Sequence, residues 1–214
     1  ADLEAKVRVD WLVRNTSVSG PTLLSLKSDT GAGKNIKHLA SRMPSFVPSL
    51  NPRPIFPGVT WNVYNNVFPE FDDENNLSMV VDLTINGVKF LFPGDLEHKG
   101  WLHLLVNNEA FRAGVKATDV LIASHHGREN GICEEMFDIL GCSPKIVVIS
   151  DDCHQYDTQQ TVQYYGSKAQ GVNFGDKLRR VLTTRCDGEI RFDFAGCAYG
   201  WTNCSLYPHL RRAA

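Results

Sequence analysis

The chain has 214 residues, of which 43% are hydrophobic and 21% charged, and its formal net charge is −2. These values are typical of one sizeable globular domain or two small ones. So small a net charge excludes a global basic field that attracts nucleic acid. No apolar run reaches the roughly 20 residues that a helix needs to span a membrane.

Residues 1–58 have the weakest pattern, and we treat them as a separate N-terminal segment. Two short apolar stretches, residues 7–13 and 22–26, are candidate strands, and the Gly-Pro pair within residues 18–21 favours a turn between them. Five prolines in residues 44–58 exclude a regular helix or a central strand there. We therefore expect a loop or linker at residues 44–58.

A regular pattern begins at residue 59, and we assign residues 59–214 to one domain. The segment opens with three predicted strands, at residues 59–64, 78–84 and 88–92. Asn86-Gly87 between the last two is a strong signal for a β-hairpin, because both positions of its tight turn require a positive φ angle.

Helices and strands alternate after this hairpin. The apolar spacing predicts helices at residues 98–112, 134–140 and 158–169. Continuous apolar runs at residues 119–123 and 145–149 predict buried strands. A final strand pair is predicted at residues 181–184 and 189–194, around Asp187-Gly188. This alternation indicates an α/β fold, in which ligands and catalytic groups tend to lie where strands end.

Three groups of polar residues follow three of these predicted strands. Asp95 comes after Pro93-Gly94, where its carboxylate could bridge two cations; the alternative is an ordinary helix N-cap. His125 and His126 follow the run at residues 119–123, and imidazole is the commonest zinc ligand. On an extended segment they would point to opposite sides, so one could bind a metal and the other the substrate. The alternative is a pair of ordinary loop histidines.

The third group follows residues 145–149. His154 and Tyr156 are candidates for lining a substrate pocket and stabilising an oxyanion, and the alternative is a polar connecting loop. The six cysteines include no C-x-x-C pair, which argues against a zinc ribbon or redox motif. Because the N-terminus has no signal-peptide pattern, we expect reduced thiols and a cytoplasmic protein. A Cys197–Cys204 disulfide is the alternative if the protein is exported.

Taken in order, these pieces resemble the second half of a metallo-β-lactamase-fold hydrolase, and the ComEC-like subgroup is the most similar. The match covers residues 59–194, and the pieces that carry it are residues 75–81, 91–97, 125–127, 147–150, 182–184 and 187–190. The resemblance implies an α/β fold of the four-layer αββα sandwich type, of which this chain would hold only the C-terminal half. It also implies a metal site at one edge of the sheets.

The resemblance further implies which residues act. Asp95 would be the bridging carboxylate and His126 the last histidine ligand, with His125 beside it, while His154 and Tyr156 would lie near the pocket. The implied cofactor is Zn²⁺, as one or two ions, with Mn²⁺ or Fe as alternatives. The expected activity is hydrolysis by a metal-activated hydroxide, most readily of a phosphodiester as in a nuclease.

One signature of the family is missing. No His-x-His occurs in the chain, although the family carries His-x-His-x-Asp-His in its first half, and each zinc ion needs about four ligands. Since the chain does not begin with Met and has little room before residue 59, we expect the first half to be cleaved off or carried by a second chain. Two alternatives are a degenerate member that serves as a non-catalytic interaction module, and a misleading resemblance.

The substrate stays open at this point. A lactamase, lactonase or thioesterase activity is the alternative to a phosphodiesterase. Phosphate-backbone binding needs clustered basic residues, and the sequence offers one modest C-terminal group, for which a solvated surface is the simpler interpretation: Arg179, Arg180, Arg185, Arg211 and Arg212.

Overall fold

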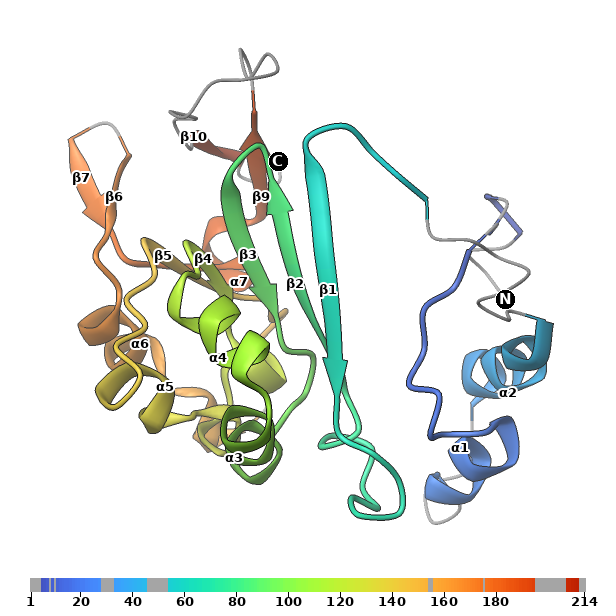
Figure 1. Ribbon diagram of the computed structural model, residues 1–214. Coiled ribbons are helices and arrows are strands. Elements are labelled where there is room, and N and C mark those ends of the chain that lie inside the picture. Colours follow the sequence, from blue (N-terminus) through green and yellow to red (C-terminus); the bar gives the residue numbers. More distant parts are fainter. Residues whose placement is uncertain are drawn as a thin grey trace.

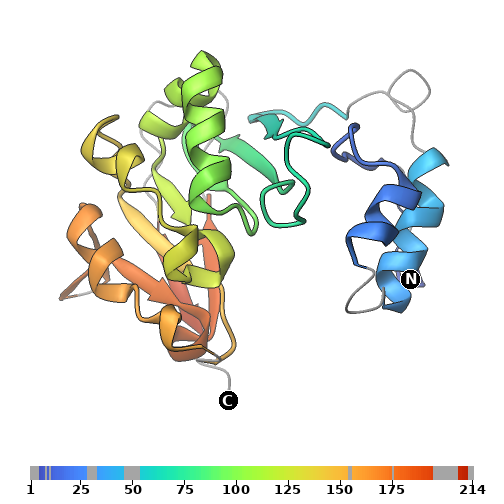
Figure 2. The same ribbon diagram turned by 90° about the horizontal axis from the view of Figure 1, so that it is seen from below.

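The computed structural model describes residues 5–7, 9, 11–27, 33–45, 54–153, 156–174, 176–194 and 207–211, the last of these as backbone only. Its centre is a mixed six-stranded sheet with the strand order β1-β2-β3-β4-β5-β8. Helices α3, α4, α5 and α6 lie together on one face of this sheet, and α1 and α2 lie beyond β1 (Figure 1, and Figure 2 from below). The mixed α/β class expected from the sequence is confirmed.

The first half of the sheet is antiparallel. Strand β1 (Val59–Asn65) pairs with β2 (Met79–Ile85), which pairs with β3 (Val88–Phe92). The turn between β2 and β3 has φ angles of 48° at Asn86 and 85° at Gly87. The predicted Asn-Gly hairpin is therefore confirmed, and its twist matches that of the flanking strands.

The second half is parallel and positions the loops that matter below. Strands β4 (Val120–Ile122), β5 (Ile146–Ile149) and β8 (Val181–Thr183) continue from β3 in the same direction. Because β3, β4 and β5 are parallel neighbours, their carboxyl ends meet at one edge of the sheet, and the segment that follows each strand begins there.

The two faces of the sheet have separate apolar cores, because successive side chains of a strand point to opposite sides. On the helical face, Leu91 and Leu121 pack with Trp101 of α3 and Phe111 of α4. On the other face, the buried side chains of β3, β4 and β5 pack with Phe192 and its neighbours, so that β6 and β9 cover this side. Within the described residues, the sheets besides the six-stranded one have two strands each.

The predicted helix at residues 98–112 is two helices, α3 (His98–Asn107) and α4 (Glu109–Lys116). Asn108 separates them because its backbone is extended and its side-chain oxygen accepts a hydrogen bond from the amide of Phe111 at 2.9 Å. An Asn at this position caps a new helix in place of continuing the old one. The other two helices are present but shorter than predicted: α5 (Glu134–Asp138) and α6 (Val162–Lys168), the latter after a 3₁₀ turn at Asp157–Gln159.

The two final strands predicted at residues 181–184 and 189–194 are present, but they do not pair with each other. Strand β8 belongs to the large sheet, whereas β9 (Glu189–Asp193) pairs with β10 (Tyr207–Arg211). Between β8 and β9 lies α7 (Thr184–Asp187), a helical turn. The Asp187 carboxylate accepts a hydrogen bond from the backbone N–H of Thr183 at 2.9 Å. A small separate pair, β6 (Val172–Phe174) with β7 (Lys177–Arg179), precedes β8.

The N-terminal segment is helical, which corrects the two candidate strands. The described residues of 7–13 form no strand, and residues 22–26 lie in α1 (Gly20–Leu26), which is followed by α2 (Lys34–Arg42) and a 3₁₀ turn (Met43–Ser45). The Ser19 hydroxyl accepts the Thr22 amide at 3.1 Å, with a Pro in the first turn, so the expected turn is a helix start. In the predicted linker, residues 54–58 form no helix or strand, and residues 46–53 lie outside the described residues.

The segment packs against the connection between β1 and β2 through a few specific contacts. The side-chain amide of Asn15 donates to the carbonyl of Asn66 at 2.8 Å, and Val18 is buried with Phe71 and Leu77. In the described ranges, no helix combines the length and the apolar character that a membrane span requires.

Candidate functional site

Asp95 and His126 meet at the edge where β3 and β4 end. The segments that carry them are tied together, because the amide of His125 donates to the carbonyl of Gly94 at 3.0 Å. Gly94 permits this sharp approach with a φ angle of 64°. As a result, the Oδ1 atom of Asp95 lies 3.5 Å from the Nε2 atom of His126, with 45% and 55% of the two side chains exposed. The structure thus brings together the carboxylate and the imidazole that the sequence singled out.

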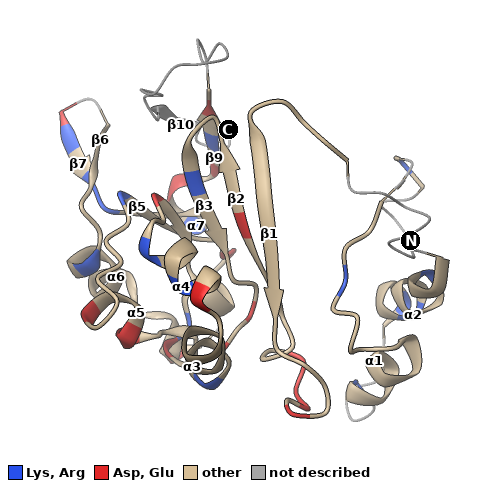
Figure 3. Ribbon diagram, viewed as in Figure 1, with Lys and Arg blue, Asp and Glu red and all other residues tan. Residues whose placement is uncertain are grey.

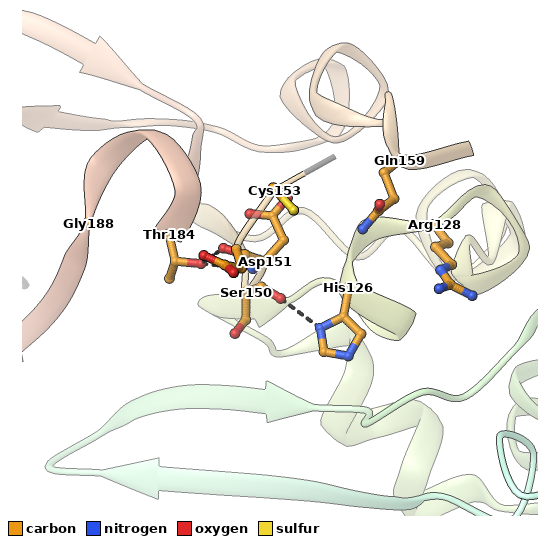
Figure 4. A pocket seen from close by; sticks show the side chains of 9 residues that line it. His126, Arg128, Ser150, Asp151, Cys153, Gln159, Thr184 and Gly188 are labelled. Carbon is orange, nitrogen blue, oxygen red and sulfur yellow. Dashed lines mark hydrogen bonds between the residues drawn. The ribbon is translucent and has the colours of Figure 1, made fainter. Parts of the chain in front are cut away.

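A third strand end fixes the His126 ring. Its Nδ1 atom lies 2.7 Å from the carbonyl oxygen of Ser150, directly after β5 (Figure 4). A carbonyl oxygen only accepts hydrogen bonds, so Nδ1 carries the proton and donates it. In the neutral ring, the lone pair is then on Nε2, the atom that faces Asp95. His126 is therefore held in one tautomer and one orientation, as a metal-binding histidine usually is.

His125 points elsewhere. Its ring is buried, with Nδ1 3.6 Å from Oε1 of Glu97 and Nε2 3.1 Å from Nη1 of Arg128. Burial, and then the nearby Arg128 guanidinium, lower the pKa of His125 below its ordinary value. Asn75 and Asn130 hold the Glu97 carboxylate through hydrogen bonds of 2.9 and 2.8 Å. His125, predicted to lie beside Asp95 and His126 as a metal ligand, thus contacts Glu97 and Arg128 instead.

The two histidines lie on a left-handed turn and not on an extended segment, which corrects the expected reason for their divergence. The φ angles are 50° at His125, 55° at His126 and 73° at Gly127. Left-handed backbone at a non-glycine residue costs of order 1–3 kcal/mol, and such residues cluster at functional sites. The Thr161 hydroxyl supports the turn by donating to the carbonyl of Gly127 at 2.6 Å.

A cavity of about 610 Å³ opens beside His126. Its lining residues come from the segments after β4, β5 and β8, and they are His126, Arg128, Ser150, Asp151, Asp152, Cys153, Gln159, Thr184 and Gly188. Figure 4 shows His126, Arg128 and Gln159 on one side and Ser150, Asp151 and Thr184 on the other. The volume is in the range of pockets that hold small-molecule ligands.

Arg128 lines the cavity although the sequence did not single it out, and Tyr156 lies against it. The guanidinium carbon of Arg128 lies 3.7 Å from the centre of the Tyr156 ring, so this half-exposed tyrosine supports a cavity-lining arginine. The residues that line the cavity do not include Tyr156. His154, the other residue predicted in this loop, lies outside the described residues. The position of Arg128, two residues after His126, was the available signal.

Two of the C-terminal arginines, Arg179 and Arg185, are paired with carboxylates. Arg185 pairs with the buried carboxylate of Asp151, and Arg179 pairs with Asp187 at 2.8 Å. Lys and Arg are scattered among Asp and Glu over the ribbon in Figure 3, without a continuous basic stripe in this view. The side chains of Arg211 and Arg212 are not among those described.

The metal-binding capacity of the described residues is limited. They include no group of three or more His, Cys, Asp and Glu residues arranged to hold a metal ion. What they offer is a pair of donors, the Asp95 carboxylate and the Nε2 atom of His126. Both donors suit Zn²⁺, but a catalytic zinc ion needs about three protein ligands.

Comparison with known proteins adds no family to this description. No protein-family model matches the chain, and no curated protein sequence matches it.

Proposed function

We propose that this protein is the metal-binding C-terminal half of a metal-dependent hydrolase of the metallo-β-lactamase type, with Asp95 and His126 as two of its ligands. The observation that supports the proposal best is the 3.5 Å approach of the Asp95 carboxylate to the Nε2 atom of His126, whose other ring nitrogen donates to the carbonyl of Ser150. Zn²⁺ is the expected ion, and Mn²⁺ or Fe are alternatives.

The physical reason concerns the two atoms that face one another. A carboxylate oxygen and the lone pair of a neutral imidazole are both electron-rich, so they repel unless a proton or a cation lies between them. A shared cation satisfies both. The carbonyl of Ser150 orients the ring in the manner of the outer partners of metal-binding histidines. The left-handed backbone at His125 and His126 adds a local cost that a binding role would explain.

Other ligands must complete such a site. We propose that they come from a separate N-terminal half of the domain or from a second chain, either of which would carry the His-x-His-x-Asp-His pattern and restore the αββα sandwich. A bound zinc ion supplies a water with a pKa of about 7 and polarises the bond to be cleaved. The residues of this chain would hold the ion, fix the His126 ring and shape the pocket. We further propose a cytoplasmic location, which suits the free thiols of Cys133 and Cys142.

A second candidate function is a non-catalytic interaction module. The observation in its favour is that the described residues provide two donors at this edge and no group of three. A third candidate keeps the hydrolase and changes the substrate to a lactam, lactone or thioester.

Metal titration tests the proposal. We expect the protein to bind Zn²⁺ in calorimetry, and Asp95→Asn and His126→Gln each to weaken this binding by at least tenfold, because each removes one of two donors. His98→Gln is the matched control, since His98 lies at an exposed position on α3, where it pairs with Glu135. Equal zinc affinity in the wild type and in both site variants would contradict the proposed site and favour the interaction module.

Activity identifies the substrate class. The metal-loaded protein, together with any partner chain that supplies the missing pattern, is assayed on bis-p-nitrophenyl phosphate and on nitrocefin. We expect hydrolysis of the phosphodiester and its loss in Asp95→Asn. Hydrolysis of nitrocefin alone would move the function to the lactamase alternative.

A further inference from the structure

Arg128 lines the cavity beside His126 and has no carboxylate partner in the part of the chain that the structure describes. Its contacts are a hydrogen bond of 3.1 Å from Nη1 to Nε2 of His125 and the Tyr156 ring, 3.7 Å from its guanidinium carbon. A guanidinium carries five N–H donors. Among the described residues, its one hydrogen bond is the bond from Nη1 to His125, and its Nε atom is buried and donates to no described atom.

The other arginine next to the cavity differs. Arg185 pairs with the Asp151 carboxylate, which follows β5, and this pair is almost fully buried. Asp151 therefore contributes little net charge to the cavity. Asp152 is the remaining carboxylate among the lining residues, and it is exposed to solvent. Arg128 is thus the lining cation whose charge no described carboxylate neutralises by direct contact.

The setting also orders the Arg128 side chain. Stacking on the Tyr156 ring holds the guanidinium plane, and the acceptor nitrogen of His125 fixes its rotation. A planar, oriented guanidinium with free N–H groups matches the oxygen atoms of phosphate, to which arginine often donates two parallel hydrogen bonds. Because the geometry is set before a ligand arrives, less side-chain entropy is lost when one binds.

From these contacts we propose that Arg128 binds the negatively charged phosphate group of a phosphodiester substrate, in the cavity beside Asp95 and His126. The inference rests on the proposed hydrolase function and names the substrate class for the same site. In this arrangement, Asp95 and His126 hold the metal ion at one end of the cavity, and Arg128 donates hydrogen bonds to the phosphate oxygens beside the ion.

Phosphate binding tests Arg128 independently of the metal. Inorganic phosphate is titrated into the full chain in the presence of EDTA, and binding is followed by ³¹P NMR. We expect Arg128→Gln to weaken binding by about tenfold or more, the factor for losing one charge-assisted hydrogen bond. Arg128→Lys should retain part of the affinity. Arg191→Gln on β9, where Arg191 pairs with Asp193 on the surface, is the matched control and should bind like the wild type. Unchanged affinity in a folded Arg128→Gln variant overturns the inference.

Kinetics separate this inference from the proposed function. In the metal-loaded complete protein, Arg128→Gln should raise KM for bis-p-nitrophenyl phosphate by about tenfold and should raise KM for the uncharged ester p-nitrophenyl acetate much less. Equal losses on the charged and the uncharged ester contradict a phosphate-binding role. If the wild type cleaves neither ester but phosphate binding still depends on Arg128, the hydrolase proposal fails and the anion site stands.

Discussion

Gly127 packs so closely on Ile149 that a Cβ atom at Gly127 would lie 2.9 Å from Cγ2 of Ile149. This contact joins the turn after β4 to the end of β5 and therefore sets how far His126 reaches toward Ser150. Gly127 also has a φ angle of 73°, where other residues are strained. The steric fit between Gly127 and Ile149 therefore helps to position His126, in addition to the hydrogen bond with Ser150.

The first prediction follows from this contact. Gly127→Ala should lower the free energy of unfolding by about 2 to 4 kcal/mol, because it adds left-handed backbone strain to an overpacked contact. Chemical denaturation measures the loss. Gly141→Ala is the matched control: Gly141 has a φ angle of 76° but no atom within 4 Å of its Cβ position. Gly141→Ala should lower the free energy of unfolding by about 1 to 2 kcal/mol, the cost of the left-handed backbone alone. Equal losses would show that the contact with Ile149 contributes nothing.

A second prediction concerns the tautomer of His126. In the neutral ring, long-range ¹H–¹⁵N correlation spectra should show a proton on Nδ1 and an unprotonated Nε2, because Nδ1 donates to the Ser150 carbonyl at 2.7 Å. Added Zn²⁺ should shift the Nε2 resonance more than the Nδ1 resonance. A proton on Nε2 in the neutral ring would contradict the proposed ligand geometry.

The third prediction tests a buried ion pair in the sheet. Lys89 contacts both carboxylate oxygens of Asp82, at 2.9 and 3.0 Å, and 3% of the Asp82 side chain is exposed. Lys89→Met should cost about 3 to 5 kcal/mol of unfolding free energy, because it leaves a buried carboxylate without its partner. Lys145→Met removes a pair with Asp119 in which 49% of the lysine is exposed, and this control should cost at most about 1 kcal/mol. Similar losses in both variants would argue against a special role of burial.

The fourth prediction uses the cysteines. Burial raises the pKa of Cys133 and of Cys142 to about 12, whereas Cys153 and Cys186 are exposed. At pH 8 the buried thiols should therefore resist iodoacetamide while the exposed ones react, which peptide mass mapping reports. A thiol whose pKa is raised on folding stabilises the protein fully below its unfolded pKa, near 9. This stability should fall as the pH rises from about 9 to 12, and rapid labelling of Cys133 in the folded protein at pH 8 would be inconsistent with its burial.

The regular part of the fold was predictable because its signals are local. Asn86-Gly87 has left-handed backbone at both positions, and the apolar runs at residues 119–123 and 145–149 are typical of buried strands. The errors came from side-chain capping. Ser19 starts a helix where apolar residues suggested a strand, and Asn108 divides one predicted helix into two. Such caps depend on one hydrogen bond and leave little trace in hydrophobic periodicity.

At the candidate site, residue type and position after a strand drew attention to Asp95 and to the His125-His126 pair, and the resemblance to metallo-β-lactamase-fold hydrolases then favoured His126. Their 3.5 Å approach depends on the parallel register of β3 and β4, which no local pattern encodes. The divergence of His125 was expected for the wrong reason, since the turn is left-handed. For Arg128 the one local signal was its position two residues after His126, because its contacts with His125 and Tyr156 depend on how the fold brings these segments together.

The edge of the sheet where β3, β4 and β5 finish has one more implication. The residues that hold the strands together, such as Leu91, Leu121 and Val147, form a set distinct from the residues that protrude from the strand ends. Amino-acid changes in the protruding segments can therefore alter ligand preference while the foldable scaffold persists. Related proteins could therefore acquire different activities through changes in these segments, with little effect on the stability of the fold.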